Sequence, residues 1–181
     1  NGQSDAFVTK LNSTGSALTY STFLGGNQGD DGRDIVVDPT GNAYVCGTTR
    51  STNYPASVGS FDTVHNGSQD AFVTKINPAG TSISYSTFLG GTLVDGCSGI
   101  AVDGAGLAYI TGSTQSSGFP TVAGSFDTTY SNQNDVFVTK LNAAGSALTY
   151  STFLGDSLTD SGMGIAIDSG GNAFVTGQTT S

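Results

Sequence analysis

Residues 20–25 read YSTFLG, and the same six residues return as 85–90 and 150–155, a spacing of 65 residues both times. A second motif, FVTK, precedes every copy at a constant distance, at residues 7–10, 72–75 and 137–140. Self-similarity at a fixed period predicts supersecondary units that pack against their neighbours along the chain. The whole chain, residues 1–181, is therefore predicted to be one repeat domain.

The composition favours turns and strands over helices. The 181 residues include 27 Gly, and all 14 acidic residues are Asp, which bends the backbone where Glu would favour a helix. With only 5 Lys and Arg the net charge is −9, which opposes binding to nucleic acid or to an anionic membrane. Because no apolar run approaches the ~20 residues of a spanning helix, we predict neither a nucleic-acid partner nor membrane insertion.

Each unit contains two hairpin patterns. In the first, the β-branched and aromatic segments 5–12 and 17–26 flank the turn Asn-Ser-Thr-Gly. In the second, residues 34–49, Asp opens and Gly closes a four-residue turn, since the carboxylate can accept backbone N–H groups and Gly accepts a positive φ. The aspartates that open these turns are therefore predicted to be structural: Asp38, Asp103 and Asp168.

Four short strands per unit, without any helical periodicity, predict an all-β chain. Apolar residues of the segment FVTKL fall on both faces, as expected for sheets that are covered on both sides. Four-stranded antiparallel sheets repeated along a chain are the blades of a β-propeller. We therefore predict a β-propeller section with a 65-residue repeat.

The longest stretch without a strand pattern, residues 50–69, recurs as residues 115–134. A loop of this length that keeps its own aromatic residues is predicted to be a folded excursion and not a linker. We expect Phe61 and Phe126, which hold the same place in the two loops, to pack against the body of the unit.

The two cysteines, Cys46 and Cys97, occupy different positions of their units. A disulfide between neighbouring units, as in exported proteins, and a pair of buried thiols are both compatible with this spacing. The sequence leaves the two interpretations open.

Residues 99–114 (GIAVDGAGLAYITGST) and 70–91 (DAFVTKINPAGTSISYSTFLGG) together resemble the bacterial beta-propeller repeat family SBBP, named for a seven-bladed propeller. The resemblance covers nearly the whole chain. It implies a secreted or surface-exposed propeller, and it brings no catalytic motif with it.

The resemblance also implies a strand order within each blade: residues 34–38 innermost, then 42–49, then 70–77, and 82–91 outermost. The chain would then hold an outer half-blade, two blades and an inner half-blade, at residues 5–26, 34–91, 99–155 and 163–179. Three blades are too few for a closed ring of ~4 to 8. Either the chain belongs to a longer propeller, or its half-blades complete each other by self-association.

In this strand order the long loops and the Gly- and Asp-rich connections leave the sheets on one face. Binding concentrates on the elaborated loops of a scaffold, so this face is the predicted binding surface for a carbohydrate or a protein. The candidates are loop aromatics and residues found in one unit only: Tyr54, Phe61, His65, Phe119, Phe126, Arg33 and Arg50.

Three further aspartates, Asp30, Asp95 and Asp160, recur just before the innermost strands. Such hard oxygen ligands are candidates for Ca²⁺, with main-chain carbonyls as additional ligands. Backbone capping is the alternative, because the chain has no DxDxDG motif. The same alternatives hold for Asp5, Asp70 and Asp135, and no other cofactor is predicted.

No catalytic residue is predicted. The sequence assigns His65 no Ser, Cys or carboxylate as a triad partner. The pair Asp30 and Asp31 keeps a polysaccharide hydrolase or lyase as an alternative. The expected function is a non-enzymatic structural or adhesive module at the outside of a cell, and a filament subunit is a further alternative.

Overall fold

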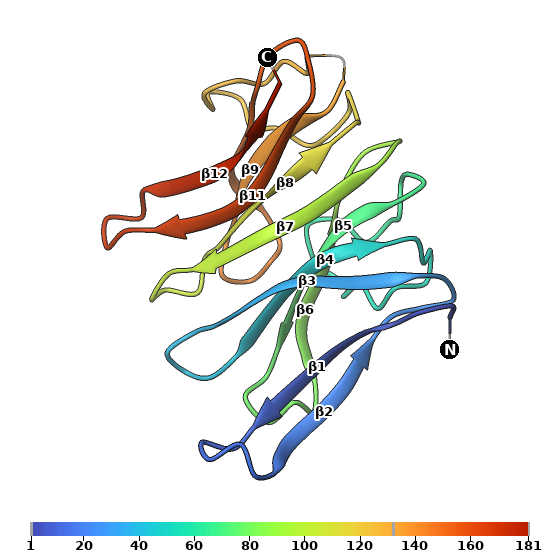
Figure 1. Cartoon of the computed structure of the whole chain (residues 1–181), viewed down its shortest axis with the longest axis vertical. Coiled ribbons are helices and arrows are strands. Elements are labelled where there is room, and N and C mark those ends of the chain that lie inside the picture. Colours follow the sequence, from blue (N-terminus) through green and yellow to red (C-terminus); the bar gives the residue numbers. More distant parts are fainter. Residues whose placement is uncertain (1, 132, 181) are drawn as a thin grey trace.

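Four antiparallel sheets lie side by side in the computed structural model, which describes residues 2–131 and 133–180 (Figure 1). The regular elements of this described part are all strands, as the composition predicts. They are β1 (Ala6–Leu11), β2 (Leu18–Leu24), β3 (Asp30–Val37), β4 (Ala43–Thr49), β5 (Asp70–Ile76), β6 (Ile83–Leu89), β7 (Asp95–Val102), β8 (Ala108–Thr114), β9 (Asp135–Leu141), β10 (Leu148–Leu154), β11 (Asp160–Ile167) and β12 (Ala173–Thr179). The described part therefore offers no apolar helix that could cross a membrane.

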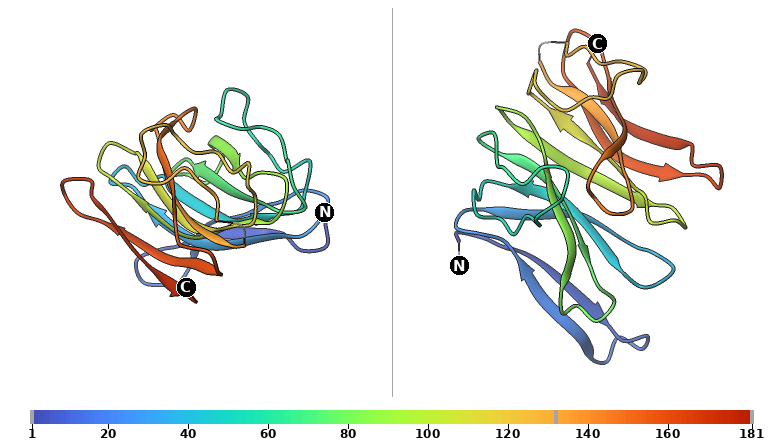
Figure 2. Two further views of the ribbon diagram at one scale, coloured as in Figure 1. Left: turned by 90° about the horizontal axis from the view of Figure 1, so that it is seen from above. Right: turned by 180° about the vertical axis from the view of Figure 1, so that it is seen from behind.

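The two middle sheets contain four strands each, in the orders β3-β4-β5-β6 and β7-β8-β9-β10. The hairpins β1-β2 and β11-β12 form two-stranded sheets at opposite ends of the stack, as the view from behind in Figure 2 shows. β7 packs against β3, β4 and β11, so the first strands of successive sheets are neighbours. The all-β propeller fold and the expected strand order are confirmed.

The first strand of each sheet begins earlier than the sequence suggests. β3 starts at Asp30 instead of residue 34 and pairs Asp30 with Thr49. Gly and Asp are depleted in strands, but the Asp30 N–H donates to the Ser4 carbonyl at 2.8 Å and so ties β3 to the preceding hairpin. The other two candidate calcium ligands likewise open strands, Asp95 in β7 and Asp160 in β11.

The strand register gathers the long connections at one end of the sheets. Asp30, Thr49 and Asp70 lie opposite one another in β3, β4 and β5. The loop 50–69 and the connection 90–94 therefore leave from this end, and the short turns lie at the other end. The two unequal faces expected from the sequence are confirmed.

The short turns have the predicted chemistry. Asp38 Oδ1 accepts the N–H groups of Thr40 and Asn42, both at 3.0 Å. The equivalent aspartates accept the corresponding N–H groups, and the glycines that close the turns have a positive φ: Gly41, Gly106 and Gly171. The structural role of the turn aspartates is confirmed.

The long loop 50–69 follows the outermost strand of its sheet. Ser57 N–H donates to the Ser86 carbonyl at 2.8 Å, and Phe88 N–H donates to the Asp62 carbonyl at 3.0 Å. The loop thus covers the outer edge of β6, which would otherwise expose unpaired backbone groups. The expectation of a folded excursion is confirmed.

The prediction that both loop phenylalanines are packed is right for Phe61 and wrong for Phe126. Phe61 packs against the core, and its N–H donates to the Gly145 carbonyl of the next sheet at 2.8 Å. Phe126 is 87% exposed. The reason is that the sheet beyond Phe126 is the two-stranded β11-β12, which lacks the outer hairpin that contains such a turn.

Candidate functional site

The recurring aspartate at the start of each first strand lies in a hydrogen-bonded cluster. Asp95 is fully buried and accepts the hydroxyl of Thr114 at Oδ1. Its Oδ2 accepts the Ser116 hydroxyl at 2.8 Å and the Gly91 N–H at 2.7 Å. The carboxylate thereby joins its own strand, the end of β8 and the connection from the preceding sheet.

The same cluster forms around Asp30, whose carboxylate accepts the hydroxyls of Thr49 and Ser51 and the Gly26 N–H. Asp160 accepts the N–H of Asp156 at 3.0 Å. Sequence reasoning missed the hydroxyl partners, although the pattern Thr-x-Ser at 49–51 and 114–116 recurs as 179–181 and could have indicated them.

The structure does not bring the three candidate calcium ligands together, since each lies in a different sheet. In the described part of the chain, no three His, Cys or Asp side chains form a group that could hold a metal ion. Asp95 is instead close to Asp70, and Asp30 is close to Asp5, because a Cβ on Gly90 or on Gly25 would meet both carboxylates of the pair. Calcium binding therefore stays a prediction, and no cluster of ligands in the described residues supports it.

The best-defined aspartate pair is Asp70 and Asp95. A Cβ on Gly90 would lie 2.8 Å from Asp70 Oδ1 and 3.0 Å from Asp95 Oδ2, so glycine is the residue that lets both carboxylates approach this point. Asp70 Oδ2 accepts the Asn66 N–H at 2.8 Å, but Oδ1 is buried without a hydrogen-bond partner in the described structure. Burial raises the pKa of Asp70, and the charge of Asp95 acts in the same direction. Burial also raises the pKa of Asp95.

In the next unit the equivalent carboxylate has a hydrogen-bond partner on both oxygens, because one neighbouring residue differs. Asp135, the equivalent of Asp70, receives the Ser131 N–H at Oδ2 and the Ser131 hydroxyl at Oδ1. Asn66 stands at the position of Ser131, and its side chain donates to Asp62 instead. The substitution of Ser by Asn therefore leaves Asp70 with an unused acceptor.

We expect Asp70 and Asp95 to lower the unfolding free energy of the protein as the pH rises above 3.8, the ordinary pKa of an aspartate. A carboxyl group whose pKa is raised in the folded state keeps its proton there while the unfolded chain loses it, so folding becomes less favourable through this window. The raised pKa values of Asp70 and Asp95 both act in this direction. Urea unfolding at several pH values measures the slope.

Two substitutions should flatten this slope. Asp70→Asn removes the titrating group, and Asn66→Ser supplies the hydroxyl that stabilises the charged form in the next unit. Asp31→Asn is the control, since its side chain is 53% exposed. An unchanged slope in Asp70→Asn would show that this carboxyl group does not titrate differently in the folded protein.

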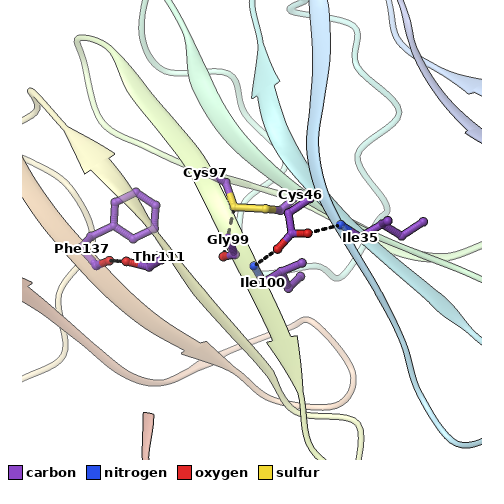
Figure 3. The surroundings of a disulfide bond; sticks show 8 residues. Ile35, Cys46, Cys97, Gly99, Ile100, Thr111 and Phe137 are labelled. Carbon is purple, nitrogen blue, oxygen red and sulfur yellow. Dashed lines mark hydrogen bonds between the residues drawn. A yellow bond between two sulfur atoms is a disulfide. The ribbon is translucent and has the colours of Figure 1, made fainter. Parts of the chain in front are cut away.

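The two cysteines form a disulfide between neighbouring sheets (Figure 3). Cys46 lies in β4 and Cys97 in β7, with their Cα atoms 5.9 Å apart. Asp34 joins the same two sheets, because its Oδ2 accepts the Ile100 N–H at 2.9 Å. Asp34, Cys46 and Cys97 are each replaced by another residue type at the equivalent positions of the other units. The contacts that they make at this junction are therefore specific to it.

Two of the candidate binding residues belong to the core instead of the surface. Tyr54 and Phe119 are each 4% exposed, and their rings lie 4.5 Å from those of Phe72 and Phe137. The prediction that Tyr54 and Phe119 are exposed binding residues is therefore wrong. The dipeptides Tyr-Pro and Phe-Pro anchor the long loops to the sheets.

The other candidates have different surroundings. His65 Nε2 lies 3.3 Å from the Thr49 carbonyl, and its ring meets Phe88 edge to face, as Tyr130 meets Phe153 in the next unit. Arg33 lies 3.7 Å from Asp31 in an exposed ion pair. Arg50 is exposed at the long-loop end of β4. His65 thus has a packing role, and it lies beside the backbone of Thr49, the residue before Arg50.

Two pockets lie along the unpaired edges of the end sheets. One, of about 420 Å³, is lined by residues of β1 and β3, including Phe7, Asp31 and Arg33. The other, of about 280 Å³, is lined by residues of β11 and β12, including Val175 and Gly177. The described part of the chain contains no convergent set of nucleophile, base and oxyanion donors at either pocket.

Stacked four-stranded antiparallel sheets, with their first strands next to one another, define a section of a β-propeller. Residues 19–55, 85–120 and 149–181 match the family model SBBP, described as a beta-propeller repeat. These segments make up more than half of the chain, so the chain belongs to the SBBP beta-propeller repeat family. No curated protein matches it. The family description contains no blade number, so the seven blades of the family name are not shown for this chain.

Proposed function

We propose that the chain is a non-enzymatic structural and binding module of a protein at the outside of a cell. Propeller repeats serve generally as scaffolds for binding. The observation that carries the proposal is that the recurring aspartates accept hydrogen bonds that hold the sheets together. They are the most plentiful candidates for catalysis, and Asp30 and Asp95 have both carboxylate oxygens engaged in buried hydrogen bonds.

The disulfide between Cys46 and Cys97 supports the extracellular location. Disulfides persist in oxidising compartments and are rare in the cytosol of most organisms. The bond joins two complete sheets, so it contributes to the rigidity of the scaffold. A rigid stack of sheets suits adhesion, in which a module carries load and presents loops to a carbohydrate or a protein.

The exposed side chains at the long-loop end are the proposed contact residues, and Arg50 lies there together with the exposed ring of Phe126. The strongly negative net charge favours neutral ligands over acidic ones. Neutral polysaccharides such as cellulose and chitin are therefore the probes to use.

Co-sedimentation with insoluble cellulose and chitin, followed by an assay of released reducing ends, tests the proposal. We expect retention on at least one polymer and no release. Arg50→Ala should weaken retention, whereas Lys10→Ala, at the β1 edge far from the long-loop face of the middle sheets, should not. Release of reducing ends that is lost in the folded variant Asp31→Asn would replace the proposal by a hydrolase, and absence of retention would remove the carbohydrate ligand.

A further inference from the structure

We infer that Asn66 is a site of covalent modification, at which the protein converts its own asparagine side chain into an aspartate or an isoaspartate. The reactants are the Asn66 side chain, the backbone nitrogen of Gly67 and water. Asp70, whose buried Oδ1 has no hydrogen-bond partner in the described structure, accepts the proton that the attacking nitrogen loses. The inference goes beyond the proposed function and concerns one of the long loops at the proposed binding face.

The reactive pair is an exposed asparagine followed by glycine. Asn66 is the one asparagine in residues 2–131 and 133–180 that glycine follows, and it is exposed, so water reaches it. The backbone nitrogen of the next residue attacks the side-chain carbonyl carbon of an asparagine and closes a succinimide ring. Glycine hinders this attack least, because it has no Cβ. The same dipeptide stands at residues 1–2, of which residue 1 lies outside the described residues.

The packing of the loop requires glycine at position 67. A Cβ on Gly67 would lie 2.2 Å from the Leu93 carbonyl oxygen and 2.9 Å from the Gly91 carbonyl oxygen. These are clashes with backbone atoms, so a larger residue would push the loop away from the connection 90–94. The unhindered nucleophile is therefore a consequence of the close contact between this loop and the connection to the next sheet.

The carboxyl group of Asp70 lies where the Gly67 nitrogen has to lose its proton. Asp70 Oδ2 accepts the Asn66 N–H at 2.8 Å, and Oδ1 would lie 3.0 Å from a Cβ on Gly67. Burial raises the pKa of Asp70, whereas the nearby N–H groups of Asn66 and Gly67 lower it by stabilising the charged form. A base with a raised pKa takes up a proton more readily than an ordinary aspartate.

The reaction balances in two steps. In the first, the Gly67 nitrogen bonds to the side-chain carbonyl carbon of Asn66 while its proton passes to Asp70. The bond from that carbon to Nδ2 breaks, and the departing NH₂ group takes a proton from water, to which Asp70 returns its own. In the second step, water opens the ring at either carbonyl and leaves an aspartate or an isoaspartate. One water is consumed and one ammonia is released.

Asp62 fixes the orientation of the reacting amide. Asn66 Nδ2 donates to Asp62 Oδ2 at 2.8 Å. Because an ionised carboxylate only accepts hydrogen bonds, the amide presents its nitrogen to Asp62 and its carbonyl oxygen to the other side. The nitrogen that leaves is therefore the one that holds Asn66 to Asp62.

The next unit has neither the reactive amide nor the unused acceptor. Ser131 stands at the position of Asn66, and its hydroxyl donates to Oδ1 of Asp135. The corresponding oxygen of Asp70 has no such donor. The replacement of serine by asparagine thus introduces the carbonyl carbon that is attacked and leaves the neighbouring carboxylate oxygen available as a base.

The product weakens the attachment of the long loop. An aspartate at position 66 lacks the amide donor to Asp62 and places a second negative charge beside it. The backbone of Asp62 ties the loop to β6, since its carbonyl accepts the Phe88 N–H at 3.0 Å and its N–H donates to the Thr87 hydroxyl at 2.9 Å. Like charges at hydrogen-bond distance repel each other, so we expect the modified loop to separate more often from β6.

Peptide mapping by mass spectrometry, after incubation of the folded protein for several weeks at mildly alkaline pH, tests the inference. We expect conversion at Asn66 while Asn77 and Asn142 stay intact. Pro78, which follows Asn77, has no N–H to lose, and Ala143, which follows Asn142, has a Cβ that hinders the attack. An Asn66 that stays intact throughout, or that converts later than Asn142, would overturn the inference.

Asp70→Asn tests the role of the base. Conversion of Asn66 should slow by about tenfold or more, because the variant lacks the proton acceptor. Asp31→Asn is the matched control and should leave the rate unchanged, since Asp31 lies in β3 and its side chain is 53% exposed. If Asp70→Asn does not fold, the unmodified chain unfolded in urea gives the same comparison and should react more slowly than the folded protein. An equal or faster rate in either comparison would overturn the role of Asp70.

Asn66→Asp tests the consequence for the loop, because it reproduces one of the two products. Hydrogen exchange of the Phe88 N–H should be faster than in the unmodified protein. Asn66→Ser is the matched control, since it removes the amide without adding a charge. If the Phe88 N–H exchanges equally fast in both variants, the added charge does not loosen the loop.

Discussion

Replacing Cys46 by Thr and Cys97 by Gly should lower the unfolding free energy by about 4 kcal/mol. The disulfide closes a loop with a sequence separation of 51 residues, and a cross-link of that length restricts the unfolded chain by about this amount. The replacement residues are those that other units hold at the same positions, Thr111 and Gly32 among them. They fit the local backbone, so the loss reports on the cross-link.

Urea unfolding of both proteins, with and without a reductant, measures the effect. The reductant should destabilise the unmodified protein and leave the double variant unchanged. If the double variant unfolds at the same urea concentration as the oxidised protein, the disulfide does not stabilise the junction between the sheets. Asp34→Ala in the double variant should lower the unfolding free energy further, because it removes the hydrogen bond by which Asp34 of β3 accepts the Ile100 N–H of the next sheet.

Asp95→Ala should lower the unfolding free energy by roughly 3 kcal/mol or more, since three buried donors lose their acceptor and each such loss costs about 1–3 kcal/mol. The donors are the hydroxyls of Thr114 and Ser116 and the N–H of Gly91. Removal of a buried charge returns part of this energy, because burial raises the pKa of Asp95 and so disfavours its charged form. The loss of three partners exceeds this gain.

Thermal and urea unfolding measure the loss, and Asp31→Ala serves as the control because Asp31 is exposed. Asp95→Ala combined with Ser116→Ala should cost less than the sum of the two single substitutions, since both remove the same hydrogen bond. A stability of Asp95→Ala equal to that of the unmodified protein would contradict the structural role of the cluster.

The repeat period predicted the architecture because identical sequences in register must form identical local structures. The hairpins and the turn at Asp38 depend on neighbours within about one unit, whereas the expected strand order came from the resemblance to the family. The early start of β3 could not be predicted in this way, because Asp30 pairs with Thr49 of β4 while its N–H bonds to Ser4, in the segment before β1. Contacts between sheets carry no local signal in the sequence.

The errors about the candidate site have the same cause, since they also concern contacts that leave no local signal in the sequence. Tyr54 and Phe119 are loop aromatics, and only the packing of the loop onto Phe72 and Phe137 shows that they are buried. Phe61 and Phe126 hold equivalent positions but differ in exposure, because the next sheet is complete for one and two-stranded for the other. The choice between a disulfide and two thiols likewise depended on the distance between β4 and β7.

Each complete sheet takes its first two strands from one sequence unit and its last two from the next, across a long loop. Sequence units and sheets are therefore out of phase by half a repeat. Duplication of any 65-residue segment adds one complete sheet and preserves every existing type of interface. The length of such a protein can thus change by whole sheets during evolution without requiring a new type of contact between sheets. Each added sheet also adds one long loop whose sequence is free to diverge.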